Sequence, residues 1–349
     1  MKSNRLVPVF VALGLLGGVA FGYWQLVSSG ADITRAAQSY LSALSEEQRA
    51  RSNLSYDIPE RVDWDFRPRA TREGLQVKEM SPAQRGAAHA LLRAALSEIG
   101  YDKAVKIMDL ENMLRELEKN KKGGPIRDPE RYYFTIYGKP EQSGRWGLGV
   151  EGHHFSLNAV IEKGKVISST PTAFASNPAT VITEVAGAAK PGTRILAKEE
   201  QLAFDLVAAL DAEQKKIAII DAKAPAEVRG VSDPQPPQSA PVGIAAKALK
   251  PAQQQILMSL VSTYTNNLPN DVAREELDAI MKNGLENLYF AWAGPEKPGI
   301  GHYYRIQAPS CLIEFVNTQP DAAGNPANHI HCVWREPTGD FAIPIGAAK

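Results

Sequence analysis

The sequence has little of what most readily assigns a protein to a class. It has no excess of either charge, because 39 Lys and Arg residues balance 39 Asp and Glu residues. A chain without net charge has no overall field to attract nucleic acid, so we expect no nucleic-acid partner. Cysteine is scarce, with only Cys311 and Cys332. These two allow one disulfide in an exported chain, or two buried thiols in neighbouring strands.

Signature motifs of common enzyme classes are also missing. The sequence contains no P-loop and no G-x-S-x-G elbow, and the G-x-G-x-x-G spacing at residues 147–152 leads into the expected histidine strand instead of opening a helix. The nucleotide-dependent and serine-hydrolase classes therefore have little support. The H-E-x-x-H pair of zinc proteases is absent too. At 44% hydrophobic and 22% charged residues, the chain nevertheless has the composition of a globular protein with a core.

One long apolar run stands at the N-terminus. Lys2 and Arg5 precede residues 6–27, which are uncharged and about as long as the roughly 20 helical residues that cross a bilayer. Residues 1–30 are therefore predicted to be a signal anchor or a cleaved signal peptide, and membrane contact is expected through this segment only. The preceding positive charges place the body outside the cytoplasm, on the cytoplasmic membrane or secreted after cleavage.

An internal repeat organises the rest of the chain. A motif of Leu or Met, a cap residue, two further residues and Gln is typical of a helix start. It begins at Leu44, Met80, Leu210 and Leu249. From the second and fourth copies, residues 80–161 and 249–316 each run helix, helix and then strands. The matching order indicates an old duplication.

The repeat predicts the fold class and the domain plan. We expect an α+β fold in which two related helix-helix-strand-strand halves pack as one unit, preceded by the N-terminal membrane segment. The single domain covers residues 31–349. Half one covers about 31–222, a Pro- and Ala-rich loop covers 223–247, and half two covers 248–349.

Histidine is rare, and its placement indicates a functional site. Four of the six histidines lie in two short runs, residues 151–158 and 328–335. The second run reads as a β-strand, in which alternate side chains point to the same side. His329, His331 and Arg335 are then expected on one face.

The preceding strand adds a carboxylate to this face. The apolar side chains within residues 311–315 share one face, which leaves Glu314 on the other. If the two strands pair antiparallel with their apolar faces matched, Glu314 lies beside His329 and His331. Two imidazoles and a carboxylate are the ligands of a facial metal triad, or of a Zn²⁺ site with one position open.

The first run contributes one more candidate ligand. If it is a strand, His154 shares a side with Ser156 and Asn158, while His153 points to the apolar side. His154 is therefore a further predicted metal ligand. Ser156 and Asn158 are predicted to contact substrate, and His153 is expected to be a buried structural residue.

These runs carry a family resemblance. Glu-Gly-His-His-x-Ser-x-Asn at 151–158, His-Tyr-Tyr-Arg-Ile-Gln at 302–307, and Asn-His-Ile-His with Val-Trp-Arg at 328–335 resemble the domain-of-unknown-function 3500 family. The resemblance covers nearly all of the chain after the N-terminal segment. Cys332 stands where the family usually has Ser, which argues against a nucleophilic or obligatory disulfide role. The resemblance implies a shared fold and no established activity.

Two functions of different classes are open at this point. The first is an exported or membrane-tethered metal-dependent enzyme, hydrolytic with Zn²⁺ and oxidative with Fe or Cu, whose catalytic residue is unassigned. The second is an extracytoplasmic protein that binds an anionic small molecule or peptide. In this binding protein, Arg305 and Arg335 are expected to hold a carboxylate or phosphate, and Tyr303 and Trp146 to stack on the ligand. A third interpretation makes the histidines structural.

Overall fold

The structure of the protein is a computed structural model that describes residues 28–346. Within them the chain forms α-helices and a thirteen-stranded sheet. The helices are α1 (Ser29–Ala43), α2 (Glu46–Ser52), α3 (Pro82–Ala95), α4 (Glu98–Glu118), α5 (Ala197–Ala209), α6 (Ala212–Ala218), α7 (Pro251–Thr265) and α8 (Asn270–Lys282). The strands are β1 (Asn53–Leu54), β2 (Leu75–Gln76), β3 (Tyr133–Tyr137), β4 (Arg145–Gly152), β5 (Phe155–Glu162), β6 (Lys165–Ser168), β7 (Thr172–Ser176), β8 (Ile219–Asp221), β9 (Ile244–Ala245), β10 (Tyr289–Ala293), β11 (His302–Ala308), β12 (Cys311–Gln319) and β13 (His329–Arg335).

The sheet is nearly symmetric about its centre. Its order is β1-β3-β4-β5-β7-β13-β12-β11-β10-β8, with β2, β6 and β9 attached beside this path. Strands β7 and β13 pair antiparallel in the middle. Parallel pairs close both ends, β1 with β3 and β8 with β10. The order of strands on one side of the β7–β13 pair therefore repeats on the other side, as an approximate twofold axis requires.

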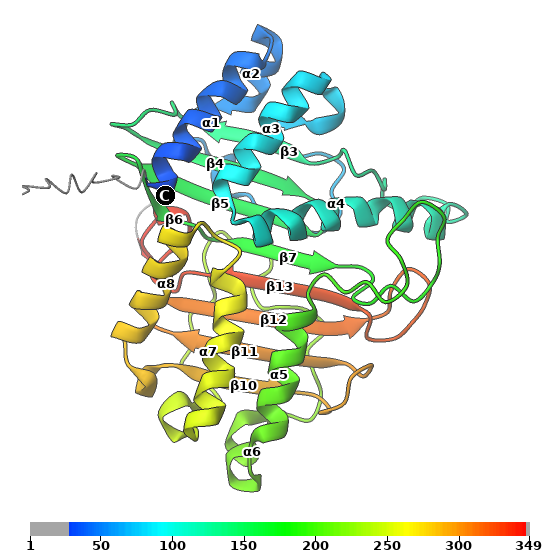
Figure 1. Ribbon diagram of the computed structural model, residues 1–349, viewed down its shortest axis with the longest axis vertical. Helices are drawn as coiled ribbons and strands as arrows, with labels where there is room; N and C mark the ends of the chain where they lie inside the picture. The colour runs from blue at the N-terminus through cyan, green and yellow to red at the C-terminus, as the bar shows by residue number, and fades with distance from the viewer. Residues whose placement is uncertain (1–27, 347–349) are drawn as a thin grey trace, which may run out of the picture.

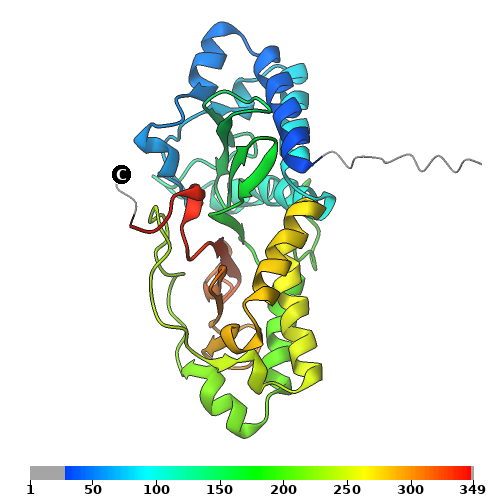
Figure 2. The same ribbon diagram turned by 90° about the vertical axis from the view of Figure 1, so that its left-hand side faces the viewer.

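Among residues 28–346, α-helices cover one face of this sheet. Figure 1 shows α1, α3, α4, α5, α7 and α8 lying across the strands, and Figure 2 shows them all on the same side. The larger apolar core lies between these helices and the sheet. The opposite face carries segments without α-helix, and a smaller core that includes Trp64, Phe66, Val228 and Phe341 packs beneath them. We call this the loop-covered face.

The repeated sequence motif forms helix caps. Helices α2, α3 and α6 each begin with a capping box, in which the N-cap side chain and a Gln three residues later satisfy one another's backbone N–H groups. The glutamine amides also pair between motifs. Gln84 donates to Gln48 at 2.7 Å, and Gln253 donates to Gln214 at 2.8 Å. The prediction of helix starts is confirmed, and the pairing shows that the first and second copies lie side by side, as do the third and fourth.

The predicted fold needs correction in its membrane segment. Across residues 28–346, no helix is both long enough and apolar enough to cross a bilayer. The apolar run at residues 6–27 that led to the prediction lies outside the described residues. The described residues therefore form an α+β fold with one large mixed sheet.

Each half is also larger than the predicted helix-helix-strand-strand unit. A further helix pair comes first in each repeat, α1 and α2 in one and α5 and α6 in the other. Since α5 and α6 match α1 and α2, half two is taken from here on to begin at α5, whereas the sequence pattern included residues 197–222 in half one. Both halves also add strands of only two or three residues. Strands this short show no alternation in a sequence, which is why the pattern did not reveal them. Residues 222–243 contain no helix or strand and run across the loop-covered face.

Candidate metal centre

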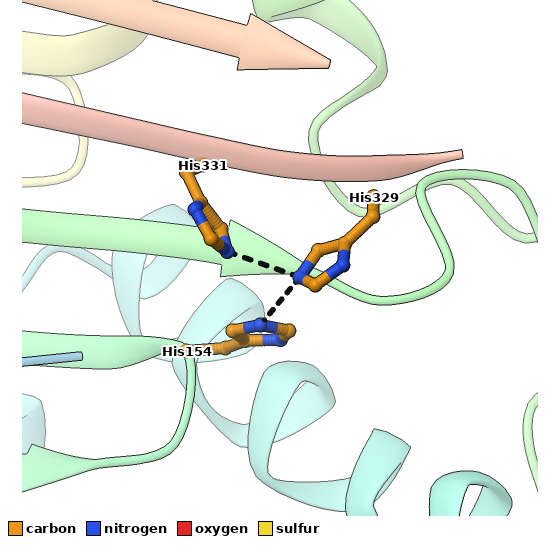
Figure 3. A group of neighbouring side chains, drawn as sticks. All are labelled: His154, His329 and His331. Atoms are coloured by element: carbon orange, nitrogen blue, oxygen red, sulfur yellow. Dashed lines mark hydrogen bonds between the residues drawn. The ribbon is translucent and has the colours of Figure 1, made fainter. Parts of the chain in front are cut away.

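Three histidines meet on the loop-covered face of the sheet. The Nε2 atom of His329 lies 2.9 Å from Nε2 of His154 and 3.0 Å from Nε2 of His331 (Figure 3). One ring nitrogen from each histidine lies within 4.8 Å of the other two. His154 comes from half one, whereas His329 and His331 come from β13 of half two. The central contact between β7 and β13 brings the two halves together at this point.

His154 is held in a tight turn. Strand β4 ends at Gly152 and β5 begins at Phe155, and these two residues pair directly, so His153 and His154 form a two-residue turn. The backbone of His154 has a φ of 67°. A residue with a Cβ costs about 1–2 kcal/mol in this region, where glycine is favoured. Backbone strain of this kind is common at functional sites. The expected strand alternation at these two histidines is wrong because both lie in the turn.

His329 and His331 alternate along β13, as the sequence pattern predicts. His331 pairs with Val316 of β12 on one side and with Ala175 of β7 on the other. An irregularity in the β12–β13 pairing sets His329 opposite Gln319. The two imidazoles face the same side of the strand, and their Nε2 atoms approach one another (Figure 3).

A carboxylate sets the proton position on His331. Both oxygens of Glu227 lie near its Nδ1 atom, at 2.9 and 2.8 Å. A carboxylate accepts hydrogen bonds, so Nδ1 of His331 carries the proton. In the neutral ring Nε2 then presents a lone pair toward the other histidines. Glu227 lies in the Pro- and Ala-rich loop, where no periodicity marked it in the sequence.

The three Nε2 atoms cannot all be satisfied by one another. A neutral imidazole nitrogen has either one proton or one lone pair. Nε2 of His329 therefore cannot form a full hydrogen bond with both His154 and His331. The arrangement becomes favourable when all three lone pairs face a cation.

Burial keeps the rings of His154 and His329 neutral. Burial lowers the pKa of His154 well below the usual 6.5, and the neighbouring imidazoles lower it further. Burial also lowers the pKa of His329 to about 3, with His331 as the second cause. At neutral pH both rings are therefore without the extra proton that would compete with a metal ion.

A second layer of polar residues backs the turn. The ring of His153 lies against that of His154, with centroids 3.6 Å apart. His153 contacts the buried carboxyl of Glu111 through Nδ1, and Arg127 lies 2.9 Å from the same atom. Arg127 in turn pairs with Glu118 at 2.7 Å. His153 is thus a mostly buried histidine with side-chain partners, and it supports the ring that faces the centre.

Glu314 is not brought to the histidines. It lies on the same face as His331, but the β12–β13 register places Glu314 opposite Val333 and Val316 opposite His331. Its buried carboxylate accepts hydrogen bonds from Tyr303 and from Nε of Arg229, the latter at 2.9 Å. The structure therefore corrects the expected His/Glu set to three histidines. Strand alternation predicts the face, whereas only the register decides the neighbour.

Two residues that were predicted to contact a ligand, Arg335 and Trp146, instead make their contacts within the protein. Arg335 is fully buried and paired with Asp340, and it donates to the backbone oxygens of Gly230 at 3.0 Å and Asp233 at 2.8 Å. These bonds hold the loop segments onto the sheet. Trp146 is buried in the core between sheet and helices, away from the loop-covered face.

Ser156 and Asn158 form a separate polar row on β5. Asn158 donates to Ser156 at 3.1 Å and to the backbone oxygen of Pro171 at 3.0 Å. Ser156 donates to Glu151 at 3.0 Å. They therefore serve a buried network of half one. Of the remaining candidates, Tyr303 and Arg305 line a cavity in half two.

The two cysteines are free and buried. Cys332 lies on the face of β13 opposite the histidines and donates to the backbone oxygen of Phe174 at 2.8 Å. Of the two alternatives left open by the sequence, the buried thiols are confirmed and the disulfide is wrong.

Comparison with known proteins identifies the family. The model of a protein family described as protein of unknown function (DUF3500) matches residues 28–343, nearly the whole chain. The chain belongs to this family, and the resemblance seen in the sequence is confirmed. No match was found among curated proteins or among solved structures.

Proposed function

We propose that this member of the family binds one transition metal ion through the Nε2 atoms of His154, His329 and His331, as the centre of an enzyme active site. The observation that carries the proposal is the convergence of three Nε2 atoms that cannot satisfy one another by hydrogen bonds. Further observations support it. The pKa values of His154 and His329 are lowered, His154 lies in a strained turn, and the carboxylate of Glu227 contacts the far side of the His331 ring.

The geometry suits a tetrahedral ion. Zn–N bonds of about 2.0–2.1 Å place ligand nitrogens roughly 3.3 Å apart in a tetrahedron. The distances of 2.9 and 3.0 Å around Nε2 of His329 lie a few tenths of an ångström below this value, and all three ligand nitrogens lie within 4.8 Å of one another, so binding the ion would also draw His154 and His331 closer together. Glu227 behind His331 is the kind of outer partner that orients metal-binding histidines and raises their basicity.

The ligand set favours Zn²⁺. Three protein ligands leave a fourth position open, as in catalytic rather than structural zinc sites. An iron site of the facial-triad type needs a carboxylate ligand, and Glu314 is engaged by Arg229 and Tyr303. A zinc ion at this position would supply Lewis acidity and a water of lowered pKa, so the proposed reaction class is hydrolysis. The residues of this chain bind the ion, and Glu227 holds the tautomer of His331.

Elemental analysis of the purified chain tests the proposal. We expect close to one zinc ion per chain after exposure to Zn²⁺ and removal of excess metal. The His329→Ala/His331→Ala double variant should retain almost none. Substituting Co²⁺ should produce the visible absorption of a tetrahedral nitrogen site in the parent and not in the double variant.

Matched variants separate loss of ligands from loss of fold. Cys332→Ser changes the opposite face of the same strand and should keep its metal. Circular dichroism and thermal unfolding should show that the double variant is folded; His331→Gln serves as a milder change if it is not. A folded parent protein that takes up no zinc, copper or cobalt would refute the proposal. Stoichiometric copper in place of zinc would overturn the hydrolytic assignment and favour oxidation.

A further inference from the structure

A second feature of the loop-covered face is a cavity in half two. It has a volume of about 860 Å³ and is bounded by β10–β12 and by the chain that follows β8. Its lining includes Lys223, Arg229, Tyr303 and Arg305. Its size is within the range of roughly 300–1,000 Å³ that is usual for small-molecule sites.

Arg305 is a buried cation without a carboxylate partner. The residue is 6% exposed, and its Nε atom has no hydrogen-bond partner among residues 28–346. In that part of the chain no carboxylate lies within ion-pair distance of it. Burial lowers the pKa of Arg305, which reflects the cost of a charge held away from water. Such a cation is rare unless something pairs with it.

The surrounding charges leave this cation uncompensated. Nε of Arg229 donates to Glu314 at 2.9 Å, and Tyr303 donates to the same oxygen. The Nη2 atom of Arg229 is buried without a partner in the described chain, as is the second oxygen of Glu314. One carboxylate therefore faces two guanidinium groups. Lys223 and Asp221 at the cavity wall offset one another in charge.

We infer that this cavity binds the oxyanion group, carboxylate or phosphate, of a small molecule, with Arg305 and Arg229 as its donors. A guanidinium group presents parallel N–H donors that fit two oxygens of such a group, and pairing with an anion removes the cost of the buried charge. The inference does not depend on a metal ion in the histidine cluster.

The position of the cavity relates it to the histidines. Tyr303, Val316 and His331 are direct neighbours across β11, β12 and β13. Strands are spaced about 4.8 Å apart, so Tyr303 and His331 lie on the same face on the order of 10 Å apart. A small molecule anchored at Arg305 can therefore extend toward the histidine cluster along this face.

Thermal unfolding in the presence of anions tests the inference. The full chain is titrated with sodium phosphate and, separately, with sodium succinate, at constant ionic strength set with chloride. We expect the melting temperature to rise by several degrees and to saturate with at least one of the two anions. The anion that acts identifies the bound group as phosphate or carboxylate.

Variants decide whether Arg305 is the cause. Arg305→Met keeps the side-chain length and removes the charge. It should abolish the saturable rise and should not lower the melting temperature when no anion is added, because it removes an unpaired buried charge. Arg145→Gln, which removes an exposed cation paired with Glu162 in half one, should keep the rise. Repeating the titration in the His329→Ala/His331→Ala variant excludes anion binding to a metal.

Three results would overturn the inference. The first is the absence of a saturable rise with both anions. The second is a rise that persists in Arg305→Met. The third is a loss of several degrees in Arg305→Met without anion, which would make Arg305 a structural residue.

Discussion

The two halves of the chain build the same sheet and place different chemistry on it. Strands β4 and β5 of half one and β11 and β12 of half two are each joined by a two-residue turn. The turn of half one contains His153 and His154, whereas that of half two contains Pro309 and Ser310. A metal-ligand candidate thus occurs at only one of two equivalent positions. The shared scaffold explains the fold, and individual side chains decide the function.

The polar rows behind these turns differ in the same way. We count the residue pairs across the two strands, beginning with the pair next to each turn. The fourth pair is Gly149 with Asn158 in half one and Arg305 with Glu314 in half two. Half one instead pairs the buried Glu151 with Arg72, at 3.2 Å. One half therefore pairs its cation with a carboxylate, while the other keeps a cation without a carboxylate partner.

The largest effect on stability is expected from Arg72→Met. Arg72 donates to Glu151 and to the backbone oxygens of Asp65 and Arg67, and burial raises the pKa of Glu151 to about 7. Removing the cation leaves a mostly buried acid with Ser156 as its remaining side-chain partner and without a balancing charge, which costs about 3–5 kcal/mol. Urea unfolding at pH 8 measures the loss. Arg305→Met in the other half should show no comparable loss; equal losses would abolish the contrast between the halves.

His154→Gly should separate metal binding from folding. Glycine suits the φ of 67° at this position, so the free energy of unfolding should stay the same or rise by about 1 kcal/mol. Loss of a ligand should weaken zinc binding by at least about 100-fold, since loss of an outer partner alone costs about 10–100-fold. Competition with a zinc chelator measures the affinity. Ser310→Gly, in the equivalent turn of half two, should leave it unchanged, and a matching loss there would contradict a centre built on His154.

Glu227→Gln should weaken metal binding by about 10–100-fold without removing a ligand. The glutamine amide is uncharged, so it holds the proton on Nδ1 of His331 less strongly than the carboxylate does. Nε2 of His331 therefore becomes a poorer ligand. The same chelator competition measures the change. Glu314→Gln is the matched control, because its carboxylate lies with Arg229 and Tyr303. A larger loss in Glu314→Gln would restore the carboxylate ligand expected from the sequence.

Where the halves meet on the helix side, Glu276→Gln should change stability in a pH-dependent way. Burial raises the pKa of Glu276 from 4.5 to about 7, with Glu336 as the second cause. The folded pKa exceeds the unfolded one, so the native state loses stability as the pH rises from about 4.5 to about 7. The variant should match the parent near pH 4 and exceed it by on the order of 1–2 kcal/mol at pH 8, allowing for partial exposure. Exposed Glu275→Gln should give the same difference at both pH values, and a pH-independent effect of Glu276→Gln would contradict the assignment.

The smallest contrast concerns the paired glutamines. Gln253 is 3% exposed, whereas Gln84 is only partly buried. Gln253→Ala leaves Gln214 and the backbone oxygen of Ala209 without their donor and should cost about 2 kcal/mol. Gln84→Ala should cost about 1 kcal/mol, because water can replace its bonds. Equal costs from chemical denaturation would mean that the two motif pairs are buried alike.

Much of the scaffold could be read from the sequence because its signals are local. The capping boxes that begin α2, α3 and α6 depend on residues three apart, so the motif predicts them wherever they occur. The alternation of β13 likewise predicts that His329 and His331 share a face. The predicted location outside the cytoplasm stays a prediction, since its signal lies in residues 6–27.

The site itself depended on contacts that no local pattern contains. The register of β12 on β13 sets Val316 opposite His331. A register shift of two residues would instead have placed Glu314 opposite His331, and every side chain of β12 would still point to the same face of the sheet as now. Glu227 reaches His331 from a loop without periodicity. The sequence by itself therefore determined the family, the helix starts and the faces of the strands, because these follow from neighbouring residues. Only the tertiary structure decided which nitrogens converge and which charges stay unpaired, since both depend on how distant strands and loops pack.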